Sequence, residues 1–267
     1  MDFIGEYYFD FGIMADNLGP ILDGFWLTIQ LSVFGGVLAL AWGLVLALLR
    51  QLPGKPLAPV RWITIAYIDM FRGIPMLLVL LLVSGFLSSA QAENVIPEWL
   101  GLPTWLGQTS PFWYGVISLT LTYGAYMAEV YRAGIEAVPE GQMEAARSLG
   151  MSHGQAMRDV IVPQAVRKVI PPLLNDFIAL MKDTSLVSVI GALEVVQAGF
   201  DVQTREFNGS GLMLGAILFL LVTIPLARVV DRLIARQQRR TARGGADEGG
   251  DGGGEPVAPP ATGLAGA

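Results

Sequence analysis

Long apolar runs separated by short polar connections dominate this chain of 267 residues. A helix of about 20 apolar residues, rising about 1.5 Å per residue, is long enough to cross a hydrocarbon core of about 30 Å. The pattern therefore predicts an all-α integral membrane protein with about five transmembrane helices. The predicted crossings are residues 24–49, 63–88, 112–131, 166–199 and 212–230.

Basic residues in the connections predict how these helices are oriented. The first connection carries Arg50, Lys55 and Arg61 and no acid, whereas the second carries Glu93 and Glu98 and no base. Short loops rich in Lys and Arg face the cytoplasm. We therefore expect a multi-pass protein of the cytoplasmic (inner) cell membrane, with its N-terminus outside and its C-terminus in the cytoplasm.

Composition divides the chain into three parts. Residues 1–22 hold several acids and no base, which predicts an external N-terminal segment that is not a cleaved signal peptide. Residues 23–240 form the predicted transmembrane domain. Residues 241–267 are rich in Gly, Ala and Pro, and they predict a disordered cytoplasmic tail because they offer little apolar surface to bury.

The overall composition excludes several function classes. Charged residues make up 15% of the chain and hydrophobic residues 53%, while a soluble domain is about 25% charged. Cysteine is absent and His153 is the only histidine, so cysteine chemistry and a histidine-rich metal site are excluded. No Gly-x-x-x-x-Gly-Lys-Ser/Thr motif occurs, so we expect no ATP hydrolysis by this chain. We also expect no cofactor and no nucleic-acid partner.

The polar connection at residues 134–163 is the most informative stretch. It predicts two short helical segments, the first ended by Gly150 and the second stopped at Pro163. Ala145 and Ala146 leave one face small, so another protein could approach closely. These features indicate a docking site rather than a catalytic centre.

Because of the connection at residues 134–163, the sequence resembles the membrane-spanning permease subunits of ABC importers. The branch that it resembles is the polar amino acid (His/Glu/Gln/Arg/opine) branch. The family's cytoplasmic signature is Glu-Ala-Ala, three residues, Gly, nine residues, Ile-x-Leu-Pro. This chain has Glu144-Ala145-Ala146, Gly150 and Val160-Ile161-Val162-Pro163 at that spacing, with Val in place of Ile and Leu. Three further stretches fit the branch in the same order: Phe71 to Pro75, Ala125 to Arg132, and Lys182 to Leu186.

The resemblance implies a permease subunit, not an enzyme. Its coupling helix lies between the third and fourth crossings and sits in a cleft of a separate ATPase subunit. The residues implied in ATPase coupling are Glu144, Ala145, Ala146, Gly150 and Pro163. The implied partners are an ABC ATPase dimer that binds the ATP, a second permease chain (identical or homologous) and an extracellular solute-binding protein. The implied substrate is a polar amino acid such as glutamate, glutamine or arginine, or a compatible solute such as ectoine.

Charged residues at membrane depth are costly, and each one is a hypothesis for a functional site. The Lys182–Ser185 stretch interrupts the fourth apolar run, and irregular backbone at that depth occurs where it lines a cavity or is buried in protein. The translocation path is predicted to include Arg72, Pro75, Tyr126, Glu129, Lys182, Asp183, Thr184 and Ser185. The alternative is a structural ion pair that fixes helix packing. Arg132 is a candidate partner for Glu129.

Two other classes of function compete with the importer subunit. A secondary transporter or channel would use Glu129 as a proton carrier, and an intramembrane enzyme would need a nucleophile with a base. Neither class gives a reason for the signature at residues 144–163. The sequence therefore favours an importer subunit driven by a partner's ATPase.

Overall fold

The computed structural model describes residues 2–52, 54–93, 95 and 109–248, and its regular elements are all helical. The predicted all-α fold is therefore confirmed. The main helices are α3 (Leu18–Arg50), α4 (Ala58–Gly73), α5 (Met76–Ala92), α6 (Ser110–Glu136), α9 (Val162–Asp183) and α11 (Ser210–Glu248). Shorter helices are α1 (Asp2–Tyr8), α2 (Phe11–Asp16), α7 (Glu140–Ser148), α8 (His153–Ala156) and α10 (Val195–Glu206), with a π-helical turn η2 (Met157–Ile161) and a 3₁₀ helix η3 (Thr184–Ile190).

Small residues let α3 and α6 pack closely along their lengths. A Cβ added to Gly43 of α3 would lie 2.9 Å from the carbonyl oxygen of Gly124 on α6, so the two backbones nearly touch there. Close approach of this kind is typical of helix pairs in membranes, where packing replaces the hydrophobic effect between helices. The buried small residues of α3 are Gly24, Thr28, Ser32, Gly35, Gly36, Ala39, Gly43 and Ala47.

Helix α6 lies at the centre of the bundle, with α3, α4, α5 and α9 packed against it. One core cluster includes Phe112 and Val116 of α6 with Leu31 of α3, and a second includes Leu119 with Leu180 of α9. Because neighbouring helices cover α6, its polar side chains are not forced to face lipid.

Two helices are each long and apolar enough to cross a membrane alone, namely α3 and residues 210–236 of α11. Two pairs of helices, each pair bent at a short break, are long and apolar enough to cross a membrane only when the pair counts as one span. The described part of the chain therefore has up to four spans. Helix α6 is long enough to cross a membrane but not apolar enough to be counted as a span. The count of five crossings therefore stays a prediction.

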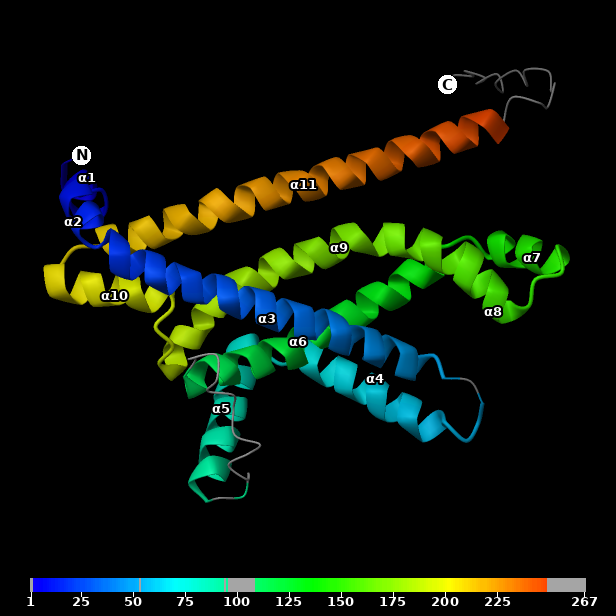
Figure 1. Cartoon of the computed structure of the whole chain (residues 1–267), viewed down its shortest axis with the longest axis horizontal. Helices are drawn as coiled ribbons and strands as arrows, with labels where there is room; N and C mark the ends of the chain where they lie inside the picture. The colour runs from blue at the N-terminus through cyan, green and yellow to red at the C-terminus, as the bar shows by residue number, and fades with distance from the viewer. Residues whose placement is uncertain (1, 53, 94, 96–108, 249–267) are drawn as a thin grey trace, which may run out of the picture.

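The second apolar run is bent rather than straight. Helices α4 and α5 meet at an angle of 111°, and α5 projects from the bundle in Figure 1. Ile74 is extended (φ −96°, ψ 132°) because the residue before a proline avoids the helical region, and Pro75 has no N–H to continue the helix. The predicted crossing at residues 63–88 is thus two helices joined at this break.

The two ends of the described chain are helical. The N-terminal segment is helical and packs on the start of α11, where the Gly209 N–H donates to the Tyr7 carbonyl at 2.8 Å. Residues 241–248, assigned by composition to a disordered tail, are helical and belong to α11. Residues 249–267 lie outside the described part.

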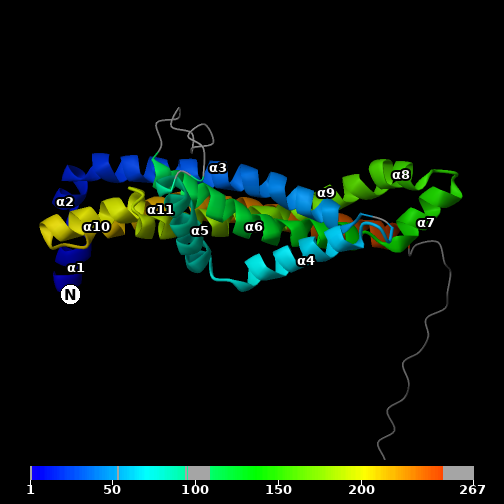
Figure 2. The same ribbon diagram turned by 90° about the horizontal axis from the view of Figure 1, so that it is seen from below.

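Figures 1 and 2 both place α7 and α8 at the end of the bundle opposite α1, α2 and α10.

The close packing of α3 on α6 predicts that Gly43→Ala lowers the free energy of unfolding by about 1–3 kcal/mol, because the added methyl meets backbone atoms that cannot move aside. Thermal unfolding of the solubilised protein measures this. The control is Gly19→Ala on the same helix, where nothing lies within 4 Å and a small gain is expected. Equal effects of both substitutions would show that the helices do not pack so closely.

Candidate functional site

A compact knob of short helices, residues 138–165, stands at one end of the bundle. Helix α7 ends as the sequence predicts, with Gly150 in the left-handed region at φ +87°. The Gly150 N–H donates to the Arg147 carbonyl at 3.0 Å and the Met151 N–H to the Ala146 carbonyl at 3.2 Å. These two bonds form a complete Schellman motif, so Gly150 fixes the direction in which the chain leaves α7.

The interior of the knob anchors it to the membrane helices. Val138, Ile161 and Ala165 are buried together, with Met143 and Met157 packed against them. At the start of α8, Ser152 and Gln155 bond reciprocally in a capping box. Because the cluster joins the end of α6 to the start of α9, a force on the knob passes to both helices.

The predicted helix stop at Pro163 is wrong, because α9 runs through that residue. The π-helical turn η2 precedes it, and the Val162 N–H donates to the Met157 carbonyl, five residues back. A π turn shifts the backbone ladder by one residue. Pro163 then falls in the first turn of α9, where its missing N–H costs little.

The outer surface of the knob differs in one respect from the sequence prediction. Glu144 and Ala145 are exposed, but Ala146 is only 3% exposed and packs against its own chain. Of the two alanines on the predicted small face, Ala145 is therefore open to a partner, whereas Ala146 is buried within the knob. Leu149 is 81% exposed and was not predicted as a site residue. The sequence signal that could have identified Leu149 was its position, as an apolar residue next to Gly150, which ends the helix.

An ion-pair network lies between the knob and the bundle. Glu129 of α6 accepts from Arg50 at the end of α3 at 2.7 Å, and it also pairs with Arg132. Arg132 pairs in turn with Glu136 one turn later. The predicted Glu129–Arg132 pair is thus confirmed. Glu129 is placed in this network, which ties the end of α3 to α6, and not with the cavity residues described next.

A cavity of about 460 Å³ opens where the α4–α5 break, α6 and α9 meet. Of the predicted path residues it collects Arg72, Pro75, Tyr126 and Asp183. Its full lining is Arg72, Gly73, Ile74, Pro75, Met76, Thr122, Tyr123, Tyr126, Asp176, Ala179 and Asp183. A cation from the break therefore shares one cavity with two carboxylates from α9.

Polar contacts within this cavity leave some groups free. The Tyr123 hydroxyl donates to the Asp183 carboxylate at 2.8 Å, and the Arg72 guanidinium lies 5.8 Å from the centre of the Tyr126 ring. One buried carboxylate oxygen of Asp176 has no hydrogen-bond partner among the described residues. The buried Thr122 hydroxyl also has none among them. Buried polar atoms are almost always bonded, so such atoms at a cavity wall are available to a ligand or to water.

Asp176 and Tyr123 are cavity residues that the sequence prediction missed. Asp176 precedes Asp183 by seven residues, which is two helical turns, so both carboxylates lie on one face of α9. That spacing was the available signal. Tyr123 could be found only through the packing of α6 against α9.

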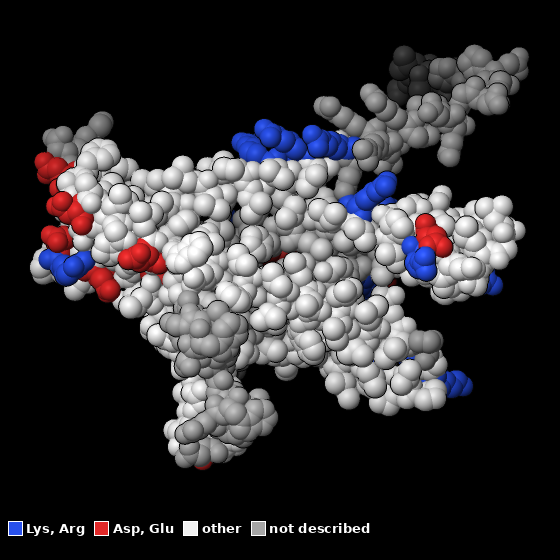
Figure 3. Space-filling view, viewed as in Figure 1, with Lys and Arg blue, Asp and Glu red and all other residues white. Residues whose placement is uncertain are grey.

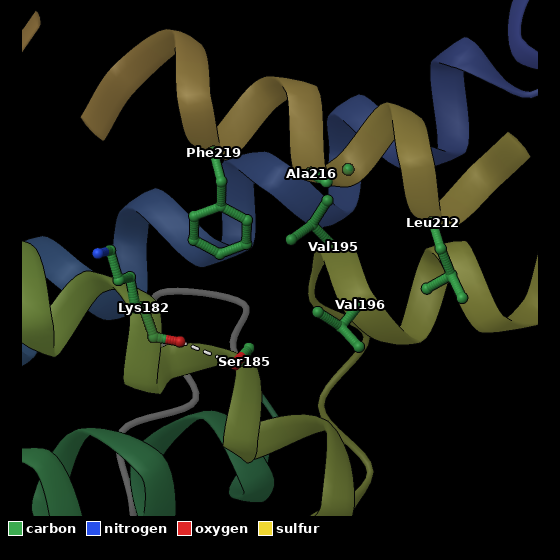
Figure 4. A pocket seen from close by; sticks show the side chains of 8 residues that line it. Lys182, Ser185, Val195, Val196, Leu212, Ala216 and Phe219 are labelled. Atoms are coloured by element: carbon green, nitrogen blue, oxygen red, sulfur yellow. Dashed lines mark hydrogen bonds between the residues drawn. The ribbon is translucent and has the colours of Figure 1, made fainter. Parts of the chain in front are cut away.

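Lys182, Ser185 and Thr184 lie apart from this cavity. Lys182 and Ser185 line a second cavity of about 280 Å³ together with Val196 of α10 and Phe219 of α11 (Figure 4). Thr184 is fully buried, and its hydroxyl donates to the Met181 carbonyl at 2.7 Å. The ion pairs among the described residues include neither Lys182 nor Asp183. Whether these residues border the translocation path or fix helix packing stays open, since the Asp183 carboxylate also ties α9 to α6 through Tyr123.

The predicted interruption at Lys182–Ser185 is confirmed, since the α-helix ends at Asp183 and the chain continues as the 3₁₀ helix η3. The chain then turns at Gly191 (φ +90°) before α10 begins. Within the described residues, no group of three or more His, Asp and Glu side chains could hold a metal ion.

Sequence comparison identifies the family. The profile described as "Binding-protein-dependent transport system inner membrane component" matches residues 39–243. The arginine transport system permease protein ArtQ of Bacillus subtilis is 33% identical over 218 residues, which cover 80% of this chain and 91% of ArtQ. The glutamate/aspartate import permease protein GltK of Escherichia coli is 34% identical over 241 residues, which cover 88% of this chain and 100% of GltK.

Comparison of the folds agrees. A chain in the crystal structure of an amino acid ABC transporter with histidines matches with a TM-score of 0.73 and 30% identity, covering 85% of this chain and 98% of that one. The MetNI methionine ABC transporter in an inward-facing conformation matches with a TM-score of 0.65 at 20% identity, covering 82% of this chain and 96% of that one, which shows a common fold.

The matched residues include both the knob and the cavity. The resemblance first suggested by the Glu144–Pro163 signature is thereby confirmed. The chain belongs to the family of binding-protein-dependent transport system inner membrane components, the membrane-spanning permease subunits of ABC importers.

Proposed function

We propose that this permease carries a polar amino acid through the cavity between the α4–α5 break, α6 and α9. The single observation behind this proposal is the opposed charge of the cavity, with Arg72 on one wall and Asp176 and Asp183 on another. An amino acid presents a carboxylate and an ammonium group on one small molecule. A guanidinium binds the first and carboxylates bind the second.

The relatives support an amino acid as the class of substrate, since ArtQ is named for arginine and GltK for glutamate and aspartate. The free oxygen of Asp176 favours a substrate with a donor group, such as an ammonium or a guanidinium. Tyr123 holds Asp183 in place, so Asp176 is the carboxylate with more capacity to bind. A compatible solute such as ectoine is the alternative within the same chemistry.

The knob is the proposed docking site for an ABC ATPase dimer, and ATP is bound by that partner rather than by this chain. Exposed Glu144, Ala145 and Leu149 supply the contact surface, and Gly150 and Pro163 shape it. Leu149 is an apolar side chain left almost fully in water, and burial in a cleft of a partner would remove that cost.

The remaining partners and the orientation follow from the same proposal. A second permease chain, identical or homologous, completes the path, and an extracellular solute-binding protein delivers the substrate. The outer end carries α1, α2 and α10. Figure 3 supports this orientation, with acidic side chains gathered at that end and basic side chains along the opposite half of α11.

Asp176→Asn is expected to lower amino acid uptake at least tenfold, because an amide lacks the charge to bind an ammonium group and a charged hydrogen bond contributes about 1.5–3 kcal/mol. Uptake by the complete transporter in proteoliposomes measures this. Asp201→Asn, which removes an exposed carboxylate on α10, is the control and should transport normally. Wild-type uptake by the Asp176 variant would remove this cavity from the path.

Gly150→Val is expected to abolish co-purification of the ATPase subunit, because a side chain in the left-handed region costs roughly 1–2 kcal/mol and the end of α7 would change direction. Gly154→Val adds the same atoms at another exposed position of the knob, where φ is not positive and nothing lies within 4 Å, so it should retain the ATPase. Retention by both variants would place the docking site elsewhere.

A further inference from the structure

The C-terminal half of α11 carries an unusual run of arginines. Residues 228–243 contain six of the chain's 17 basic residues and a single acid, Asp231. Arg228, Arg232 and Arg236 follow one another at intervals of four, so they lie along one face of the helix. Arg239, Arg240 and Arg243 continue the sequence at helical spacing, on backbone that is still part of α11.

These arginine side chains are open to their surroundings. Arg228, Arg232 and Arg236 are all exposed, and Figure 3 shows basic side chains in a row along this half of α11. Arg228 has one partner, Asp231, at 3.6 Å. The ion pairs among the described residues include neither Arg232 nor Arg236. The row therefore keeps most of its positive charge.

The same stretch of helix is amphipathic and continuous with a membrane span. Val230 is buried and Leu233 and Ile234 are half-buried, on the side of the helix away from the arginines. Residues 212–227 of α11 hold no charged side chain, and the arginines follow this apolar run directly. Charged residues that end an apolar helix run are expected at the membrane interface. Figure 1 shows α11 diverging from α9 over this half. The exposure of Arg228, Arg232 and Arg236 agrees with an arginine side that the described helices leave uncovered.

From this placement we propose that the arginine row of α11, defined as Arg228, Arg232 and Arg236, binds the phosphates of anionic phospholipids in the leaflet at which α11 emerges. Guanidinium groups bind phosphate oxygens with two parallel hydrogen bonds, and basic residues directly beside a membrane helix attract anionic headgroups. On this proposal the row lies at the depth of the headgroups, and its positive charge is complementary to their phosphates. The proposal rests on the membrane location of the family and not on the proposed substrate.

Lipid binding at this position predicts a regulated transporter. Each basic residue near the surface contributes roughly fivefold to the affinity for anionic membrane, so three contribute about a hundredfold at low salt. The attraction is screened beyond about 8 Å at physiological ionic strength. A helix end held at the headgroups by these contacts would restrict α11, which packs on α9 and α10, and so influence the cavities bordered by these helices.

The test uses the complete transporter, with its ATPase, reconstituted in phosphatidylcholine vesicles with or without phosphatidylglycerol. Phosphatidylglycerol retained through delipidation is measured by mass spectrometry, and uptake is measured in the same preparations. We expect R228Q/R232Q/R236Q to lose most of the retained phosphatidylglycerol and the stimulation of uptake by it. R228K/R232K/R236K keeps the charge and should retain a large part of both.

Matched single variants control for charge and topology. Arg232→Gln should lower lipid retention severalfold, whereas Lys55→Gln, which removes an exposed charge from the connection between α3 and α4, should not. Protease access to a C-terminal tag checks that the orientation of α11 is unchanged. Unchanged phosphatidylglycerol retention in the triple Gln variant would overturn the proposal. Loss of the ATPase subunit from that variant, with its lipid retained, would also overturn it, because the arginines would then act on the ATPase and not on lipid. Absence of uptake in every vesicle would count against the proposed function alone.

Discussion

The fold depends on keeping polar groups of the membrane helices away from lipid. Helix α6 is too polar to meet the criterion for a span of its own, yet it lies at the centre of the molecule. The small residues of α3 make that possible, because Gly43 lets the two backbones approach to within ordinary contact. With α3 on one side and α9 on another, Tyr123 and Thr122 of α6 are turned inward and never need to face hydrocarbon.

The same constraint locates the two proposed functional regions, the cavity and the knob. Polar groups enclosed by α6, α9 and the α4–α5 break must bond to each other or border a cavity. The result is a cavity with Arg72 on one wall and Asp176 on another. At the end of the bundle, where water can solvate the backbone, the chain forms the short helices of the knob. The buried cluster of Val138, Ile161 and Ala165 joins that knob to α6 and α9, so the proposed docking site and the cavity share two helices.

Local chemistry made part of this structure predictable. Gly150 ends a run of helix formers, and Lys182-Asp183 interrupts an apolar run, so the turn of the knob and the break after α9 could be predicted from sequence. The helical continuation through Pro163 depends on a π turn, which leaves no simple sequence pattern. Packing decided the rest: Ala146 faces inward although Ala145 faces out, and the neighbours Lys182 and Asp183 line different cavities.

Water access to the cavity tests the central claim most directly. The chain has no cysteine, so single cysteines can be introduced without background labelling. Ala179→Cys places a thiol on the cavity wall, and Leu82→Cys places one on the apolar surface of α5, where the native side chain is 60% exposed. A charged, membrane-impermeant maleimide in membrane fragments open to both sides should label the first and label the second only after denaturation. Protection of both thiols until denaturation would contradict a solvated path through this cavity.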